Sequence, residues 1–362
     1  MRKRLKIEKR PVDRKLLFLT VGLSLFGVLA ITDASTPQAL RYFSDSFYFV
    51  KSQIVSLVIG LISLIIFSKI DFRIWKKFSV VFLVVILVML IVVLIPGFGI
   101  KSLGARRWIN LGLVSFQPSE FVKLFFAVYV SSLVGAKKSL LSFLIPTVIV
   151  AFLVVLQPDM GTALVILGIA SSAIFIEGIN LFKLISLSLV ASVVGLATVL
   201  ISDYRRERLM SFLNSSNDPL TGSYHVKQIL LGLGLGGFFG TGLGQSRQKF
   251  LFLPESATDS VFVVIAEELG FLGAVTVILL LGLLVYRIFK IALGSPDRFA
   301  ASFTTCVGIW IGLQSFLNIG SMVVLVPLTG IPLPFFSFGG TSLIALLTSI
   351  GIVLNISKNQ GG

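Results

Sequence analysis

Four carboxylates lie close together in one stretch of the sequence and are the first candidates for chemistry. Glu255 and Asp259 belong to the polar segment FLPESATD, and Glu267 and Glu268 follow in the apolar run that comes next. A carboxylate within hydrogen-bond reach of a hydroxyl group can remove its proton as a general base. Two carboxylates together can also hold a divalent cation. The stretch therefore predicts an acid–base or metal-assisted site where the polar segment meets the apolar run.

Helical geometry separates the two glutamates of the apolar run. If Asp259 opens a helix, Glu267 lies about 80° around the axis from it and Glu268 about 180°. Glu267 is therefore expected to share the Asp259 side and support the site from behind, while Glu268 faces away. The simpler interpretation of Asp259 is an N-cap to Val261 or Phe262, worth about 1 kcal/mol. For each glutamate the simpler interpretation is pairing with a basic residue of the bundle.

Other ionisable residues lie near the ends of apolar runs. Pro118 suits the first turn of a helix, where Glu120 is favoured by the helix dipole. Lys123 is three residues further on and shares a helix face with Glu120, as a structural ion pair or a substrate contact. Asp159, in QPDMG, fits a helix cap better than catalysis, although a cap there would shape the outer end of a cavity. Arg107 precedes a tryptophan and is a candidate for binding anionic head groups.

The long segment 202–259 carries three further cations, Lys227, Arg247 and Lys249. Its glycines formally match G-x-G-x-x-G between positions 232 and 237, but no strand–helix–strand unit surrounds them, so we expect no nucleotide site. The glycines instead predict tight backbone packing and irregular structure at the membrane edge. The length of the segment and its Pro, Gly and Asn content indicate a functional loop rather than a simple connection between two helices.

Apolar helices must position these residues. The chain of 362 residues is 56% hydrophobic and 13% charged, about half the charged fraction of a soluble protein. Its mean hydropathy is +1.00, and apolar runs of membrane-spanning length recur. We expect an all-α integral membrane protein with one polytopic domain over 16–357, a basic segment 1–15 and a tail 358–362. Ten spans are predicted, at 16–34, 48–68, 77–97, 117–136, 140–157, 160–178, 182–201, 260–287, 299–324 and 337–357.

Basic residues between the runs indicate the orientation. The first fifteen residues hold eight Lys or Arg, and the later basic clusters fall on the same side if there are ten spans. Both termini are then cytoplasmic, the first run is an uncleaved helix, and 202–259 is a large extracytoplasmic loop. The net charge of +15 thus marks topology rather than nucleic-acid binding.

Residue counts limit the cofactors. A single histidine, His225, leaves no His-cluster zinc site, and a single cysteine, Cys306, leaves no internal disulfide. We expect no nucleotide, haem or zinc. A metal ion would need carboxylate and phosphate oxygens, which suits Mg²⁺ or Mn²⁺.

Seven segments resemble, in chain order, the signature blocks of the SEDS family, the shape, elongation, division and sporulation proteins of bacteria. They are GARRWINLG, FQPSEFVKL, QPDMGTAL, YHVKQ, GLGQSRQKFLFLPE, TDSVFVVIAEELG and GIPLPFFSFGGTSL. The resemblance covers about residues 16 to 357. The blocks GLGQSRQKFLFLPE and LPFFSFGGTS look closer to the FtsW branch of this family than to its RodA branch.

The resemblance implies a ten-helix peptidoglycan glycosyltransferase that polymerises lipid II at the outer face of the bacterial cytoplasmic membrane in cell division. It implies a class B penicillin-binding protein as the cross-linking partner, beside other division or elongation membrane proteins. The essential aspartate of the family maps onto Asp259 and the preceding glutamate onto Glu255. The family usually has histidine where this chain has Ala257 and phenylalanine where it has Ser260, which puts in doubt a histidine as an obligatory base.

The implied reaction makes two demands. The attacking sugar hydroxyl must lose a proton, and Asp259, tuned by Glu255, is the expected general base. Because the family inverts the anomeric configuration, one displacement with one base suffices. The leaving undecaprenyl pyrophosphate needs positive charge, either from a divalent cation held by Glu255 and Asp259 or from side chains. The candidate substrate-binding residues are Arg107, Glu120, Lys123, Asp159, Lys227, Arg247 and Lys249.

Three other functions stay open at this point. Intramembrane carboxylates would also fit a transporter that flips lipid II, and a helix junction near Pro332 and Pro334 would fit a transport path. A RodA-like elongation polymerase and a non-catalytic division scaffold are the others. Charged groups clustered at the outer ends of helices favour the polymerase, whereas a polar path through the bilayer favours transport.

Overall fold

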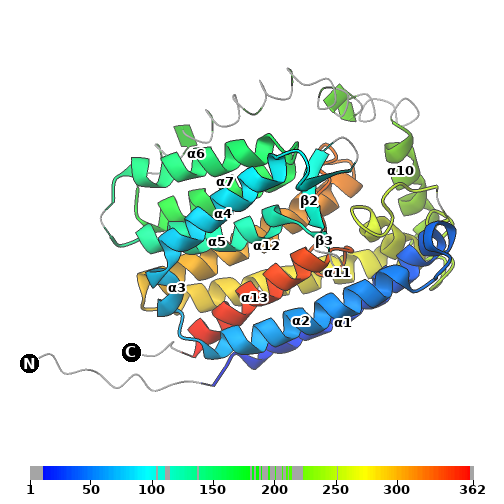
Figure 1. Ribbon diagram of the computed structural model, residues 1–362. Helices are drawn as coiled ribbons and strands as arrows, with labels where there is room; N and C mark the ends of the chain where they lie inside the picture. Colours follow the sequence, from blue (N-terminus) through cyan, green and yellow to red (C-terminus); the bar gives the residue numbers. More distant parts are fainter. Residues whose placement is uncertain are drawn as a thin grey trace, which may run out of the picture.

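The computed structural model describes residues 11–102, 105–110, 115–136, 138–179, 223–250 and 252–358, with a few isolated positions between 182 and 213. Most of the described chain is helical, and the long helices run side by side (Figure 1). The helices are α1 (Arg14–Phe43), α2 (Tyr48–Lys69), α3 (Arg73–Lys77), α4 (Ser79–Leu94), α5 (Pro118–Leu133), α6 (Leu140–Val155), α7 (Met160–Ile176), α10 (Tyr224–Gly236), α11 (Val261–Leu293), α12 (Arg298–Met322) and α13 (Gly340–Ser357).

Five of these helices are long and apolar enough to cross a membrane, namely α1, α2, α11, α12 and α13, and α4, α6 and α7 are shorter apolar helices. The chain is thus a multi-pass membrane protein. Helices lie at nine of the predicted spans, although α1 continues past the predicted end at 34 to Phe43. Most of the predicted span 182–201 lies outside the described residues, so the count of ten and the side of the termini stay predictions.

Small residues set the closest helix contacts. At Gly351 of α13, an added Cβ would lie 2.7 Å from the backbone oxygen of Leu64 in α2. At Gly60 of α2, it would lie 2.5 Å from the Leu347 side chain. Glycines that let helix backbones approach this closely are typical of membrane bundles, where packing rather than the hydrophobic effect drives association. α2 and α13 therefore form a close pair on one side of the bundle.

A three-stranded antiparallel sheet corrects the expectation of a purely helical fold. Strands β1 (Gly99–Ser102), β2 (Ala105–Asn110) and β3 (Ser115–Phe116) form the sheet in the order β1-β2-β3. The segment 98–116, which lies between the predicted spans 77–97 and 117–136, is thus partly a hairpin. β2 carries Arg107, so the sheet rather than a flexible loop positions that side chain.

The segment 202–259 also contains regular structure that the sequence did not predict, the helix α10. Its glycines are used for packing, since an added Cβ at Gly236 would lie 2.2 Å from the backbone oxygen of Ala266. A Cβ at Gly232 would lie 2.7 Å from the Val263 side chain. The expected tight packing is confirmed, but the expected irregular structure is wrong for Gly232 and Gly234, which lie inside the helix.

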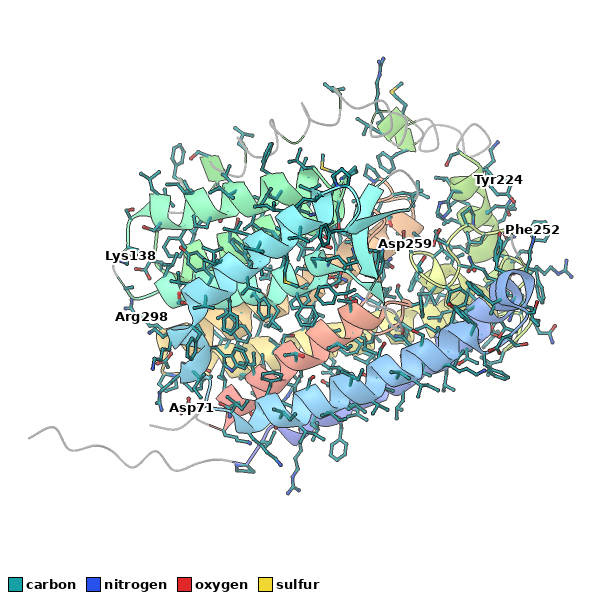
Figure 2. The ribbon with its side chains drawn as sticks, viewed as in Figure 1. Asp71, Lys138, Tyr224, Phe252, Asp259 and Arg298 are labelled. Atoms are coloured by element: carbon teal, nitrogen blue, oxygen red, sulfur yellow. The ribbon has the colours of Figure 1, made fainter. Side chains whose placement is uncertain are left out.

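Contacts far apart in sequence define one end of the bundle. The backbone N–H of Asp13 donates to Ser357 Oγ at 3.2 Å, and the N–H of Phe72 donates to Asn355 Oδ1 at 3.1 Å. The start of α1 and the end of α13 therefore lie together. Figure 2 shows Asp71, Lys138 and Arg298 toward this end and Tyr224 and Phe252 toward the other, with Asp259 nearer the second group.

The helix α11 is broken near its start. Gly270 has a φ of 67° and a ψ of −166°, so residues 261–269 form a separate short helix before the long one. The remaining residues 271–293 would extend about 35 Å, which already spans a bilayer core of about 30 Å. Glu267 and Glu268 thus lie in the short helix before the break, and the residues after the break are long enough to form a span without them.

Candidate active site

The turn from Pro254 to Ser260 carries the two candidate catalytic carboxylates. The backbone oxygen of Glu255, whose φ is 51°, accepts hydrogen bonds from the N–H groups of Thr258 and Ser260 at 3.1 and 3.0 Å. The hydroxyl of Thr258 donates to Glu255 Oε2 at 2.7 Å. Glu255 is exposed and Asp259 half-buried. The closed turn therefore presents both carboxylates within five residues, with Asp259 at the entry to α11.

The expected cap is corrected. Ser260, not Asp259, is the N-cap residue of α11, and its side chain makes no capping hydrogen bond. Its hydroxyl instead donates to the carbonyl of Pro254 at 3.1 Å. Because that carbonyl can only accept, the one hydroxyl proton is used there, and His225 Nε2, 3.0 Å away, must be the donor to Ser260 Oγ. The first turn of α10 thus lies against the residue that follows Asp259.

Glu267 and Glu268 hold the same loop, although they lie on different sides of the short helix. Glu267 accepts from the Ser246 hydroxyl at 2.5 Å and from the Arg247 backbone N–H at 2.8 Å. Glu268 accepts from the backbone N–H groups of Gly244 and Ser246, both at 3.0 Å. The loop wraps around the end of the short helix and so reaches both sides of it.

The loop also caps the broken helix itself. The N–H of Phe271 donates to the carbonyl of Gly237 at 2.9 Å, and the carbonyl of Glu268 accepts from Gly242 at 3.0 Å. A Cβ at Gly270 would lie 2.3 Å from the backbone N of Gly240, so the two backbones touch there. Backbone groups left unpaired by the break are thus satisfied by residues 237–242.

Lys249 is enclosed by two carboxylates rather than open to a ligand. Its Nζ lies 2.6 Å from Asp33 Oδ1 in α1 and 2.7 Å from Glu268 Oε1, and its side chain is 4% exposed. Burial alone would lower the pKa of Lys249, but the hydrogen bonds to the two carboxylates outweigh it, and the pKa is raised. The ammonium therefore stays charged and ties the loop to α1 and α11.

The candidates Arg107 and Asp159 come together at another position. The guanidinium of Arg107 donates to the carbonyl of Gln157 at 2.8 Å and to that of Pro158. Asp159 is the N-cap of α7, as predicted, and accepts from the backbone N–H of Thr162 at 3.0 Å. Arg107 thus joins the sheet to the segment before α7 through hydrogen bonds to two backbone carbonyls.

Glu120 and Lys123 form the predicted ion pair, with 2.8 Å between Lys123 Nζ and Glu120 Oε2. Both side chains are almost fully buried, at 1% and 2% exposed. The ammonium of Lys123 also donates to Gln314 Oε1 at 2.8 Å and lies 5.2 Å from the Trp310 ring centroid. The pair is an internal part of the bundle between α5 and α12.

Two predicted cations are more accessible. Arg247 is exposed on the loop that Glu267 and Glu268 hold, and Lys227 is half-buried on α10. Lys227 lies close to Asp259, since α10 is tied to Ser260 through His225, whereas the loop of Arg247 is held at the other end of the short helix by Glu267. Among the described residues, no group of three or more His, Cys, Asp or Glu is arranged to hold a metal ion. A metal ion bound by Glu255 and Asp259 would therefore need phosphate oxygens as further ligands. This metal site stays a prediction.

Sequence reasoning missed several residues around this turn. Asp33 neutralises Lys249, and an aspartate inside an otherwise apolar first span was the signal for it. Asn318 donates to the carbonyl of Asp259 at 2.9 Å, and Phe338 N–H donates to that of Ala257 at 2.8 Å. Nothing in the sequence pattern joins these positions, because the contacts cross between helices far apart in the chain.

Comparisons with known proteins give consistent results. The chain matches the model of the FtsW, RodA and SpoVE family, described as "Cell cycle protein", over residues 14–361. It is 38% identical to stage V sporulation protein E of Bacillus subtilis, covering 97% of this chain and 98% of that protein. It is also 38% identical to the probable peptidoglycan glycosyltransferase FtsW of Buchnera aphidicola, covering 97% and 95% of the two chains.

Two solved structures resemble the fold. One, described under "Structural coordination of polymerization and crosslinking by a peptidoglycan synthase complex", has a TM-score of 0.78 and 28% identity and covers 96% of this chain and 98% of that one. The other is the rod shape determining protein RodA of Thermus thermophilus, with a TM-score of 0.71 and 28% identity, covering 96% and 97%.

Proposed function

The chain belongs to the FtsW/RodA/SpoVE family of cell cycle proteins, and on that premise we propose that it is a peptidoglycan glycosyltransferase that polymerises lipid II. Relatives named peptidoglycan glycosyltransferase match it along nearly its whole length. The observation that carries the assignment is the arrangement around Asp259. Asp259 is half-buried at the end of a closed turn, beside the helix α10 that carries Lys227, and the loop that carries Arg247 leads into this turn.

In the proposed reaction a sugar hydroxyl of one lipid II molecule, the acceptor, attacks the anomeric carbon of the donor. The donor is a second lipid II molecule or a growing glycan chain that is still linked to undecaprenyl pyrophosphate. The new C–O bond forms as the bond to the pyrophosphate oxygen breaks, and the hydroxyl proton passes to the Asp259 carboxylate. The undecaprenyl pyrophosphate leaves with the bonding electron pair, and nearby positive charge stabilises it. Inversion at the anomeric carbon needs no second carboxylate as nucleophile. Glu255 would tune Asp259 as a neighbouring negative charge.

The cations divide into two groups under this proposal. Arg247 and Lys227 are the preferred pyrophosphate ligands, because their side chains are exposed or half-buried on segments next to the turn. Arg107 is half-buried and already donates to two carbonyls, so only its remaining N–H groups could bind substrate. Lys123 and Lys249 have carboxylate partners inside the protein and would act by anchoring helices and the loop. Mg²⁺ or Mn²⁺ on Glu255 and Asp259 would supply further charge neutralisation at the pyrophosphate.

Cellular placement follows from the family and from the charge pattern. We place the active site on the extracytoplasmic side of the cytoplasmic membrane, with both termini in the cytoplasm. The end of the bundle where α1 begins and α13 ends carries Arg73, Lys77, Arg298 and Lys358, which fits a cytoplasmic surface. A class B penicillin-binding protein is the proposed cross-linking partner, in line with the synthase complex whose structure resembles this chain. Relatives named FtsW favour division over elongation.

Transport of lipid II is the second candidate, favoured by the buried Glu120–Lys123 pair within the bundle. Glu267 and Glu268, which would otherwise suggest a polar path, are instead satisfied by loop donors. The two candidates separate in detergent, where no membrane divides two compartments. Purified protein with lipid II, with and without the transpeptidase and with Mg²⁺ or EDTA, should produce glycan chains and undecaprenyl pyrophosphate. Absence of any glycan under all these conditions would contradict the proposed polymerase.

A further inference from the structure

Two amide side chains on one face of α12 make buried hydrogen bonds, and one of them reaches the turn that carries Asp259. Gln314 and Asn318 are four residues apart and therefore lie one above the other on the helix. Both are buried, with 1% of each residue exposed. Buried amides are costly unless their groups are paired, so their partners indicate what the residues are for.

The orientation of Gln314 follows from the chemistry of its partners. Its Oε1 accepts from the Lys123 ammonium at 2.8 Å and from the Trp310 indole N–H at 2.7 Å. Both partners can only donate, so the amide oxygen must face them. The amide nitrogen consequently faces the carbonyl of Pro332, to which it donates at 2.8 Å. Gln314 thus joins the buried Glu120–Lys123 pair to the segment that precedes α13.

Asn318 makes the corresponding connection one turn further along. Its Nδ2 donates to the carbonyl of Asp259 at 2.9 Å and to that of Ile331 at 2.8 Å. Both partners can only accept, so this amide is also fixed in one orientation. Its Oδ1 is buried and has no hydrogen-bond partner within the described part of the chain. The side chain therefore contributes through its two donated bonds, one of which ends on the backbone of Asp259.

The same turn is fixed at the two preceding carbonyls from the same segment. Ser337 donates its hydroxyl to the carbonyl of Thr258, and the N–H of Phe338 donates to that of Ala257 at 2.8 Å. The segment is itself held firmly, since a Cβ at Gly27 of α1 would lie 2.0 Å from the backbone oxygen of Phe335. Three consecutive carbonyls before α11 thus accept hydrogen bonds from α12 and from the segment that precedes α13.

We infer that Asn318 is a positioning residue for the Asp259 carboxylate, and that through its two donated hydrogen bonds it fixes the distance between this carboxylate and the bound sugar hydroxyl. The inference rests on the proposed function and adds a residue that does not touch the substrate. A general base must lie within hydrogen-bond reach of the proton it removes, and a displacement of about 1 Å can cost about a hundredfold in rate. Loss of the Asn318 amide would therefore act on turnover rather than on substrate binding.

The test is lipid II polymerisation by purified Asn318→Leu protein, which keeps the side-chain size and removes both donors. We expect kcat per folded molecule to fall about a hundredfold while KM for lipid II stays within about twofold. Ser315→Ala is the matched control, since Ser315 is buried on the same helix with a hydroxyl that has no hydrogen-bond partner among the described residues. Its kcat and KM should equal those of the wild type. If Asn318→Leu does not fold, Asn318→Asp replaces the donor nitrogen by oxygen at constant shape and is measured in the same way.

The outcomes separate this inference from the proposed function. A kcat per folded molecule within about twofold of wild type in the Asn318 variant would overturn the positioning role. A rise in KM at unchanged kcat would overturn it too, because that pattern marks lost substrate binding. Asp259→Ala is measured in parallel. If Asp259→Ala retains activity, the assignment of Asp259 as the base is wrong. If the wild type makes no glycan, the proposed function is wrong. Neither conclusion depends on the result for the Asn318 variant.

Discussion

One pair of carboxylates precedes α11 and a second pair lies within its first turns, and the surroundings of the two pairs differ. Glu267 and Glu268 are buried, and their oxygens accept hydrogen bonds from the loop 244–249. Glu255 is exposed and Asp259 half-buried, at the end of a turn whose backbone carbonyls accept hydrogen bonds from Asn318, Ser337 and Phe338. Residues of the same type thus anchor a loop in one pair, and in the other pair they are the proposed reactive groups.

The environment of a carboxylate decides which of these roles it can take. A hydrogen bond to a charged group contributes about 1.5–3 kcal/mol, so the several donors on Glu267 and Glu268 fix the loop firmly. A general base needs the contrary arrangement, a fixed backbone and a carboxylate that can approach a substrate hydroxyl. Changes in the first pair should therefore affect stability, and changes in the second should affect turnover.

The largest effect is expected from Asp259→Asn, which keeps the shape and removes the base. Polymerisation of lipid II should fall about a thousandfold, in the range that a positioned general base contributes. The melting temperature in detergent should stay at the wild-type value, because the backbone carbonyl of Asp259 keeps its bond to Asn318. Rate assays and thermal unfolding of the same preparation check this prediction. A large drop in melting temperature would show that Asp259 has a structural role like that of Glu267 and Glu268.

The next largest effect is on stability and comes from Lys249→Met, which leaves two carboxylates without their cation. Removing one partner of a buried ion pair costs about 3–5 kcal/mol. Lys51→Met is the matched control, because Lys51 pairs with Asp45 at 2.7 Å with both side chains well exposed. Thermal unfolding should show a marked loss for Lys249→Met and none for Lys51→Met. Equal melting temperatures for the two variants would contradict the anchoring role.

A smaller loss of stability is expected from Gly270→Ala, which tests the break that separates the acidic short helix from the spanning one. The new methyl group would meet the backbone of Gly240, and alanine is strained at a φ of 67°. We expect a loss of about 2–3 kcal/mol on unfolding. Gly282→Ala in the same helix, where nothing lies within 4 Å of an added Cβ, should cost nothing. Wild-type stability in both variants would show that the break is not required.

The smallest effect is expected from Glu255→Gln. The amide oxygen can still accept from the Thr258 hydroxyl, so the turn is kept, and only the negative charge near Asp259 is lost. We expect kcat to fall by no more than about tenfold, equal to about 1.4 kcal/mol. A loss as large as that of Asp259→Asn would make Glu255 an equal partner in catalysis, for instance as a metal ligand, and a dependence on Mg²⁺ in the same assay would then identify that role.

The sequence predicted what depends on local patterns. Apolar runs placed most of the described helices, and Pro118 and Asp159 marked helix starts because first-turn prolines and capping aspartates act within one turn. α10 was missed because its glycines lower helix propensity, and tertiary packing against α11 overrides that propensity. β1 to β3 were missed because such short strands carry little periodic signal.

The anchoring role of the glutamates could not be predicted for a different reason. Helical geometry assigns Glu267 and Glu268 to different sides of the helix. Different sides imply different partners only where each neighbouring element approaches along one face. The loop 244–249 passes around the end of a broken helix and reaches both. The bond from Asn318 to Asp259 joins positions 59 apart in the chain, which no local pattern links.

One measurement tests the contrast between the two pairs most directly, the rate of lipid II polymerisation per folded molecule for Asp259→Asn and Glu267→Gln side by side. We expect a loss of more than about a hundredfold for Asp259→Asn, as for a removed general base. For Glu267→Gln we expect a loss of less than about tenfold, because its cost falls on stability through weakened hydrogen bonds. Wild-type turnover by folded Asp259→Asn protein would contradict the proposed role of Asp259 as the base.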